Sequence, residues 1–190
     1  MSSINSLPNT LSIGLGANII SPAGSPTSTL ITVRPIIEKT IIQWLNDFID
    51  EKGLKDSVWE KTSFHWSSLY KTKPVGGPKD QPYFINAVVI VSGENFTKLS
   101  PSLKAANDLL DRLGAIERQF GRDRITTWGP RSLDIDILAW SDLHSQDKNL
   151  KLPHPRSIER NFVIIPLAEA LKSNSDEMPI KLNPQEGWEE

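Results

Sequence analysis

The chain has 190 residues, with 21 Lys and Arg against 23 Asp and Glu, a formal net charge of −2 and no cysteine. The near-neutral charge argues against indiscriminate binding to nucleic acid, and the missing cysteines exclude thiol nucleophiles, disulfide frameworks and zinc ribbons. Three scattered histidines leave no all-protein zinc site, so we expect any metal to be bound by oxygen.

One domain accounts for this length, because a domain of this size buries roughly 70 % of its unfolded surface and needs no disulfide or structural metal. We predict a flexible N-terminus at residues 1–10, a single domain at 11–171 and a C-terminal tail at 172–190. The first ten residues lack the basic and apolar parts of a secretory signal. The longest apolar stretch is far shorter than the roughly 20 residues that span a bilayer. We therefore expect a cytoplasmic protein that does not bind membranes.

The first half of the chain begins with a short alternating apolar strand, predicted over residues 11–15 and followed by a glycine-rich turn at 14–18. An amphipathic helix comes next, and its regular part is expected to start at Pro35. Its apolar stripe recurs at three- and four-residue steps through Leu30, Val33, Ile37, Ile41, Trp44 or Leu45, and Phe48.

An aromatic-rich strand is predicted over residues 64–70, an irregular Pro- and Gly-rich loop over 72–82, and a further strand over 84–91. The second and third predicted strands are joined only by that loop, which favours antiparallel pairing over a parallel sheet.

The second half of the chain begins with a second long helix. Ser100 and Pro101 predict its N-cap and first turn, and Gly121 predicts its end. A strand follows over residues 133–140, and a shorter third helix over 162–171. The resulting β-α-β-β-α-β order predicts an α+β fold of the ferredoxin-like type, an antiparallel sheet with helices packed on it in an α/β/α three-layer arrangement.

The last predicted strand carries two aspartates. Side chains alternate along a strand, so Asp134 and Asp136 share one face, opposite Ile135, with Cα atoms about 6.6 Å apart. Two neighbouring carboxylates repel each other unless solvent, a shared proton or a cation relieves them. By itself the pair fits either a solvated strand face or a Mg²⁺ site.

Arginines surround this strand. Six of the eight arginines in the chain lie between Arg118 and Arg160, and a guanidinium group binds two phosphate oxygens while remaining charged. The combination predicts a Mg²⁺-nucleotide site. Arg118 also fits a solvated helix end, whereas Arg122 and Arg124 lie in a polar segment that is typical of a mobile lid and also contains Trp128.

No standard phosphate-binding loop is present. Gly14 and Gly16 lack the third glycine of the dinucleotide fingerprint, and the chain contains neither a P-loop nor a nucleophile elbow. Covalent acyl chemistry therefore has no support, and a bound nucleotide must be held in another way.

The residues around the aspartates form the run Trp128-Gly129-Pro130-Arg131-Ser132-Leu133-Asp134-Ile135-Asp136-Ile137-Leu138. This run resembles the signature of the 6-hydroxymethyl-7,8-dihydropterin pyrophosphokinases, folate-pathway enzymes that transfer pyrophosphate from ATP to a pterin alcohol. Further segments fall in the family's order, at residues 70–76, 81–87, 116–122, and 152–154 with 160–162. The resemblance covers about residues 11–171 and implies a ferredoxin-like fold, ATP as co-substrate and two Mg²⁺ ions.

The resemblance also implies a role for each matching residue. The Mg²⁺ ligands would be Asp134 and Asp136, and the catalytic arginines at the phosphates would be Arg122, Arg131 and Arg124. The ATP contacts would be Glu117, Ile137, Lys151, His154, Arg156 and Arg160. The pterin contacts would be Thr72, Pro74, Val75, Phe84, Asn86, Trp128 and Phe162.

The residues themselves bear on three of the pterin contacts. Taken alone, Phe84 and Phe162 also fit the reading of ordinary core aromatics. Asn86 is the more unusual residue, because a buried amide in the middle of a strand needs hydrogen-bond partners, which the edge of a pterin would supply.

We therefore predict that the pterin hydroxymethyl oxygen attacks the β-phosphorus of ATP in line and that AMP leaves. Two other functions remain open at this point: a Mg²⁺-dependent nucleotidyltransferase, and a non-catalytic regulator that binds ATP or a pterin. We expect a monomer whose partners are small-molecule substrates.

Overall fold

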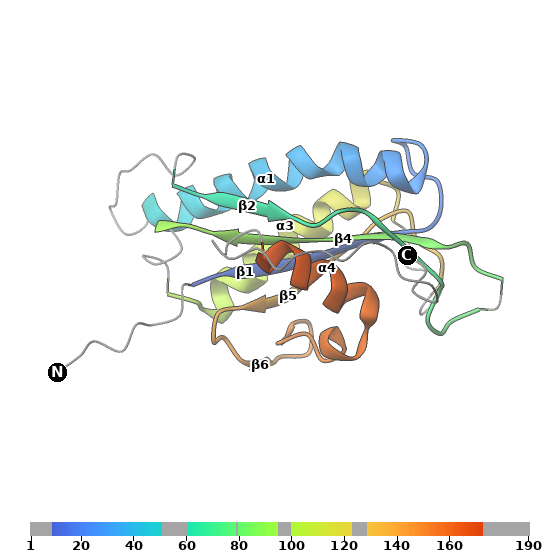
Figure 1. Ribbon diagram of the computed structural model, residues 1–190. Helices are drawn as coiled ribbons and strands as arrows, with labels where there is room; N and C mark the ends of the chain where they lie inside the picture. Colours follow the sequence, from blue (N-terminus) through green and yellow to red (C-terminus); the bar gives the residue numbers. More distant parts are fainter. Residues whose placement is uncertain (1–8, 51–60, 79, 95–99, 123–128, 173–190) are drawn as a thin grey trace.

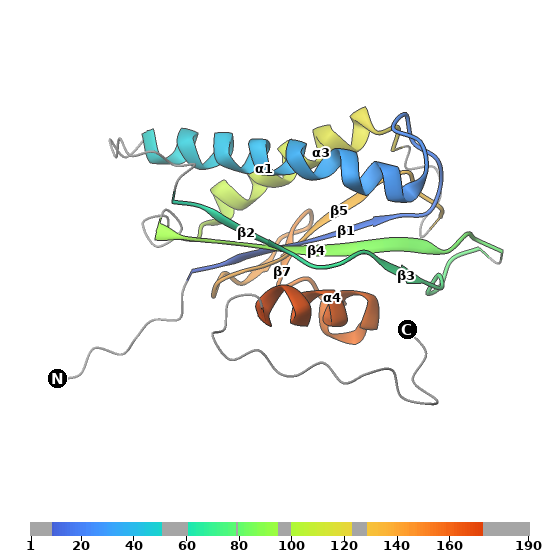
Figure 2. The same cartoon turned by 45° about the horizontal axis from the view of Figure 1, so that its top comes forward.

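A computed structural model describes residues 9–50, 61–78, 80–94, 100–122 and 129–172. Over these residues, an antiparallel five-stranded sheet carries three α-helices (Figure 1). Figure 2 shows α1 (Pro26–Asp50) and α3 (Leu103–Gln119) on one side of the sheet and α4 (Asn161–Lys172) on the other. The described helices include none that is long and apolar enough to cross a membrane.

The sheet is centred on β1 (Leu11–Ala17), which pairs antiparallel with β4 (Phe84–Ser92) on one side and with β5 (Asp134–Trp140) on the other. The outer side of β4 pairs with β2 (Ser63–Trp66) and β3 (Tyr70–Thr72), so the main strand order is β2-β4-β1-β5. A separate small sheet joins β6 (Ser145–Gln146) to β7 (Lys151–Leu152), and a 3-10 turn, η1 (Ser157–Glu159), precedes α4.

The first helix begins nine residues earlier than predicted, at Pro26, and contains Pro35 inside it. The signal for its start is the pair Ser25-Pro26: the Ser25 hydroxyl accepts a hydrogen bond from Ser28 N at 3.2 Å, and proline suits the first helical position. Pro35 removes one helical hydrogen bond, but Leu30 and Val33 on the turns before it are buried in the core. This packing keeps the helix continuous through the proline.

Three other predicted boundaries are wrong. The turn predicted over residues 14–18 is mostly strand, because β1 continues to Ala17. The strand predicted over residues 64–70 is split into β2 and β3, because the Ser67 hydroxyl accepts the hydrogen bond of Val88 N, at 3.0 Å, in place of a backbone carbonyl. The second long helix is capped by Ser102 and not by Ser100; the Ser102 side chain accepts from Ala105 N at 3.3 Å. The predicted end of that helix is correct, since Gly121 follows it with a φ of 76°.

The two faces of the sheet are packed unequally. The larger core lies beneath α1 and α3, where the indole of Trp44 packs edge-on against Trp140 at 5.2 Å and donates to the Ala105 carbonyl at 3.0 Å. The other face carries a small cluster of Val88, Leu138 and Val163. The face of the sheet toward α4 is therefore only partly filled.

Candidate functional site

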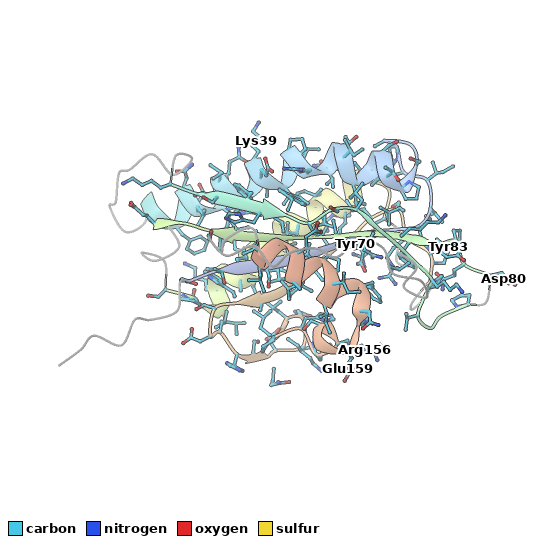
Figure 3. The ribbon with its side chains drawn as sticks, viewed as in Figure 1. Lys39, Tyr70, Asp80, Tyr83, Arg156 and Glu159 are labelled. Carbon is cyan, nitrogen blue, oxygen red and sulfur yellow. The ribbon has the colours of Figure 1, made fainter. Side chains whose placement is uncertain are left out.

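A cavity of about 930 Å³ opens beside β1, β4 and β5. Two glycines of β1 line it, and a Cβ added at Gly16 would lie 2.9 Å from the Asn86 side-chain oxygen. The central strand therefore leaves the space that the cavity occupies. Figure 3 shows the flanking loops: Asp80 and Tyr83 mark the loop before β4, and Arg156 marks the loop before α4.

Asp134, at the start of β5, is paired with two arginines. Its carboxylate accepts from Arg131 Nη1 on one oxygen, and Arg122 Nη2 lies 2.5 Å from the other. The three side chains are between 13 % and 23 % exposed, so these charges are largely withdrawn from water. Desolvation strengthens ion pairs of this kind, and a guanidinium that also donates to a phosphate oxygen would share its charge between that oxygen and Asp134.

Arg122 has a second acidic partner, Glu117, which comes from the last turns of α3. The Glu117 side chain is only 4 % exposed; it pairs with Arg122 Nη1 and also accepts a hydrogen bond from Ile135 N at 2.7 Å. One buried carboxylate therefore joins α3, β5 and the arginine. The family resemblance predicts that Glu117 contacts ATP; in the structure Glu117 lines the cavity and links two elements of the fold.

Asp136 lies on the same side of β5 as Asp134 and also lines the cavity, as strand alternation predicts. Burial, followed by the nearby charge of Asp134, raises its pKa to about 7. Within the described residues, its carboxylate makes no hydrogen bond or ion pair. It is therefore available to bind a cation.

The donor set fits Mg²⁺. Two carboxylates face one cavity, and one of them is buried without a cationic partner within hydrogen-bond distance. The described residues contain no group of three or more His, Cys, Asp or Glu side chains that could enclose a metal alone. Mg²⁺ suits such an incomplete site, because it is commonly bound by one or two carboxylates together with water and substrate phosphates.

One wall of the cavity is basic and contains His154, Arg156 and Arg160. Burial, with a smaller effect from Arg160, lowers the pKa of His154, so its imidazole is neutral at pH 7. The His154 amide donates to the Leu138 carbonyl at 2.7 Å, which anchors this wall to β5. The site therefore has permanent guanidinium charges and one neutral imidazole.

At the β4 end, the cavity is lined by a mixture of amide, hydroxyl and aromatic groups. The Asn86 amide, in a residue only 5 % exposed, donates to the Thr72 hydroxyl at 2.8 Å. Phe84 and Phe162 both line the cavity and are half-buried, so neither is simply a core aromatic. Pro74 and Val75 complete this end from the loop after β3.

Two of the expected site residues that the structure describes do not line the cavity. Ile137 is 2 % exposed and lies in the larger core, and Lys151 is exposed on β7; neither lines the cavity. Arg124 and Trp128 lie outside the described residues.

Sequence reasoning missed the role of Asn18, which follows β1 and is only 2 % exposed. Its side-chain oxygen accepts from Arg131 N at 2.7 Å, and its amide donates to the Pro82 carbonyl at 3.2 Å. Asn18 thus ties the loop before β4 to the segment that carries Arg131. Its position directly after a Gly-rich strand end was the available signal, since asparagine there bonds readily to backbone groups.

This chain is similar in sequence to proteins of one known family. The protein-family model described as 7,8-dihydro-6-hydroxymethylpterin-pyrophosphokinase matches residues 12–172. The 2-amino-4-hydroxy-6-hydroxymethyldihydropteridine pyrophosphokinase of Haemophilus influenzae is 41 % identical over 133 residues, which cover 62 % of this chain and 77 % of that protein. The protein of the same name from Bacillus subtilis is 39 % identical over 121 residues, covering 64 % of this chain and 66 % of that protein.

A third relative is a larger protein, the mitochondrial folate synthesis bifunctional protein of Arabidopsis thaliana. It is 42 % identical over 161 residues, which cover 81 % of this chain and 27 % of that protein.

Proposed function

The chain belongs to the 7,8-dihydro-6-hydroxymethylpterin-pyrophosphokinase family, and we propose that its cavity is where it transfers pyrophosphate from ATP to the hydroxymethyl group of 6-hydroxymethyl-7,8-dihydropterin, a step of folate biosynthesis. One observation supports placing the reaction in this cavity. Two carboxylates and a set of arginines line one part of it, and an amide with two aromatic rings lines another. The first part suits a metal-bound polyphosphate and the second a flat heterocycle.

We assign the pterin to the β4 end. The rings of Phe84 and Phe162 offer aromatic faces, and Asn86 and Thr72 offer hydrogen-bonding groups for the polar edge of the heterocycle. The contacts of Pro74 and Val75 with the pterin belong to the same proposal. Trp128, from outside the described residues, stays a prediction here.

We assign Mg²⁺ to Asp134 and Asp136, with two ions as the number that the family resemblance implies. When bound, Mg²⁺ neutralises charge on the polyphosphate and makes the phosphorus easier to attack. Asp136 is the carboxylate without an arginine partner among the described residues, and Asp134 is shared with Arg122 and Arg131.

The arginines act on the phosphates. As ATP enters, Arg122 and Arg131 exchange part of their contact with Asp134 for phosphate oxygens, and Arg156 and Arg160 bind the chain of phosphates from the basic wall. His154, whose pKa burial lowers in the protein alone, offers a ring N–H to the same phosphates. Glu117 keeps Arg122 in place during the exchange. Adenosine contacts from Ile137 and Lys151 stay predictions.

The chemistry then needs little covalent help from the protein. The hydroxymethyl oxygen forms a bond to the β-phosphorus of ATP, the bond from that phosphorus to the oxygen shared with the α-phosphorus breaks, and AMP leaves with that oxygen. Positioning of the two substrates and neutralisation of the developing charge supply most of the acceleration.

We also propose that the fold is ferredoxin-like. The strand order β2-β4-β1-β5, with β3 continuing the pairing of β2 along β4, and the positions of α1 and α3 between strands support this reading. The monomeric state and the cytoplasmic location stay predictions.

The test of function is product analysis after incubation with ATP, Mg²⁺ and 6-hydroxymethyl-7,8-dihydropterin. AMP and a pterin pyrophosphate, formed in equal amounts, are expected. Release of free pyrophosphate with a nucleotidylated pterin would indicate a nucleotidyltransferase, and tight binding of both substrates without turnover would indicate a regulator. Chelation of Mg²⁺ should abolish the reaction.

A further inference from the structure

The helix α4 contributes to the proposed pterin end of the cavity but has little apolar attachment to the sheet. In the small cluster on this face, Val163 of α4 packs with Val88 of β4 and Leu138 of β5, and Phe162 and Leu167 of the same helix add partly buried surface. Phe162 lies in the first turn of this helix. The position of α4 on the sheet therefore decides where the Phe162 ring lies.

A polar contact adds to this attachment. The carboxylate of Glu169 on α4 accepts hydrogen bonds from Ser68 N at 2.8 Å, from the Ser68 hydroxyl at 2.8 Å and from the Tyr70 hydroxyl at 2.9 Å. Figure 3 labels Tyr70, at the start of β3, beside α4. An ionised acceptor makes each of these bonds stronger than a neutral one would be.

The donors of these bonds come from the segment that leads directly into the proposed pterin end. β3 has three residues and pairs with β4, which places Tyr70 opposite Asn86 and Thr72 opposite Phe84. The Thr72 hydroxyl then accepts from the Asn86 amide. Any shift of β3 therefore reaches both polar groups assigned to the pterin.

Glu169 and Phe162 lie seven residues apart, about two turns, so they project from the same side of α4. One end of the helix thus holds β3 while the other carries the aromatic ring. We propose that Glu169 is a positioning residue, which fixes the distance between Phe162 and the Thr72–Asn86 pair and thereby sets the affinity for the pterin. This inference rests on the proposed function, because it assumes that the pterin lies between these groups.

Three variants and one control test it. Glu169→Ala removes the acceptor. Glu169→Gln keeps most of the geometry, because its amide oxygen can accept from Ser68 N and Tyr70, and its amide nitrogen can donate to the Ser68 hydroxyl. Tyr70→Phe removes the hydrogen bond from the Tyr70 hydroxyl to Glu169 and leaves the two bonds from Ser68. The control is Ile165→Ala, on the same helix at a side chain that is 50 % exposed.

The measurements are the dissociation constants of 6-hydroxymethyl-7,8-dihydropterin and of a non-hydrolysable ATP analogue with Mg²⁺, together with hydrogen exchange of the amides in residues 67–72. For Glu169→Ala we expect the pterin constant to rise about tenfold, the effect of one strong hydrogen bond, and the nucleotide constant to stay within about twofold. Amide exchange in residues 67–72 should become faster. The pterin dissociation constant of Glu169→Gln should stay within about threefold of the wild-type value. That of Tyr70→Phe should lie between the values for Glu169→Gln and Glu169→Ala.

Equal weakening of both ligands by Glu169→Ala, or pterin binding equal to that of Ile165→Ala, would overturn the positioning role. If Glu169→Ala does not fold, Tyr70→Phe carries the same test, because a selective loss of pterin affinity is expected there and unchanged affinity contradicts it. Failure of the wild-type protein to bind the pterin at all would instead contradict the proposed function, so the two failures are distinguishable.

Discussion

The buried carboxylate of Glu117 provides a quantitative test of how the site is held together. Its Oε1 atom takes both the ion pair with Arg122 and the hydrogen bond from the buried amide of Ile135. Glu117→Ala removes both, whereas Glu117→Gln can keep an oxygen for the Ile135 amide and loses the charge. Glu117→Gln therefore keeps an acceptor and most of the side-chain volume that Glu117→Ala removes.

The magnitudes follow from burial. A buried amide left without an acceptor costs about 1–3 kcal/mol. Breaking a buried ion pair costs about 3–5 kcal/mol when the remaining charge is left alone, but Arg122 keeps Asp134 as a partner, so the cost here is smaller. We expect Glu117→Ala to lower the free energy of unfolding by about 3 kcal/mol and Glu117→Gln by about 1 kcal/mol.

Thermal unfolding of the protein without substrates or metal measures this difference. For a chain of this size 1 kcal/mol corresponds to about 2–4 °C, so Tm should fall by about 6–12 °C for Glu117→Ala and by about 2–4 °C for Glu117→Gln. Asp111→Ala, at an exposed acid on the same helix, is the matched control and should stay within about 0.5 kcal/mol of the wild type. Equal losses of unfolding free energy in the two Glu117 variants would refute the role of the Ile135 hydrogen bond. No loss in either variant would refute a stabilising role for Glu117.

Three further outcomes are expected. The folded pKa of Asp136 is raised to about 7 from 3.8, so the metal-free protein should lose stability as pH rises from about 4 through about 7. Thermal unfolding of Asp136→Asn in EDTA should lack this part of the pH dependence. An unchanged dependence of stability on pH in that variant would contradict the assignment. Gly16→Ala should displace the Asn86 amide and raise the KM for the pterin by about tenfold, as measured by steady-state kinetics. Gly14→Ala, whose Cβ would meet the flexible side chain of Leu138 at 3.3 Å, should leave the same KM within about twofold of the wild type. Equal effects of the two variants would argue against the placement of Asn86. Arg131→Ala should lower kcat by about a hundredfold or more while Mg²⁺-dependent AMP formation remains detectable, and a wild-type kcat would remove Arg131 from the chemistry.

The sequence predicted the parts of the fold that depend on local periodicity. Alternation along β5 was enough to place Asp134 and Asp136 on one face, and the glycine at 121 was enough to end α3. The start of α1 was missed, because the burial of Leu30 and Val33 outweighs the local effect of Pro35. Tertiary packing of this kind cannot be read from a single segment.

The candidate site was predicted in its residue types but not in their pairing. Sequence reasoning gave the aspartates to Mg²⁺ and the arginines to phosphate, yet in the protein alone Asp134 binds both Arg122 and Arg131. Glu117 offered a usable signal, since it follows Leu113 by four residues and so falls on the buried side of α3. A carboxylate at such a position requires buried partners, although the sequence cannot say which they are.

The pairing of β1 with both of its neighbours fixes the distance between the proposed pterin and metal contacts. Gly16 lies opposite Asn86 on β4 and opposite Asp134 on β5, so one proposed pterin contact and one proposed metal ligand stand on a single line across the sheet. Neighbouring strands are about 4.8 Å apart, which puts these two Cα atoms about 10 Å from each other. Main-chain hydrogen bonds, and not loops, maintain that span. Insertions or deletions in the loops around the cavity should therefore change substrate affinity without changing the distance between the Asn86 and Asp134 backbones. Deleting one residue within β1 would instead turn its glycines away from the cavity and close the cavity.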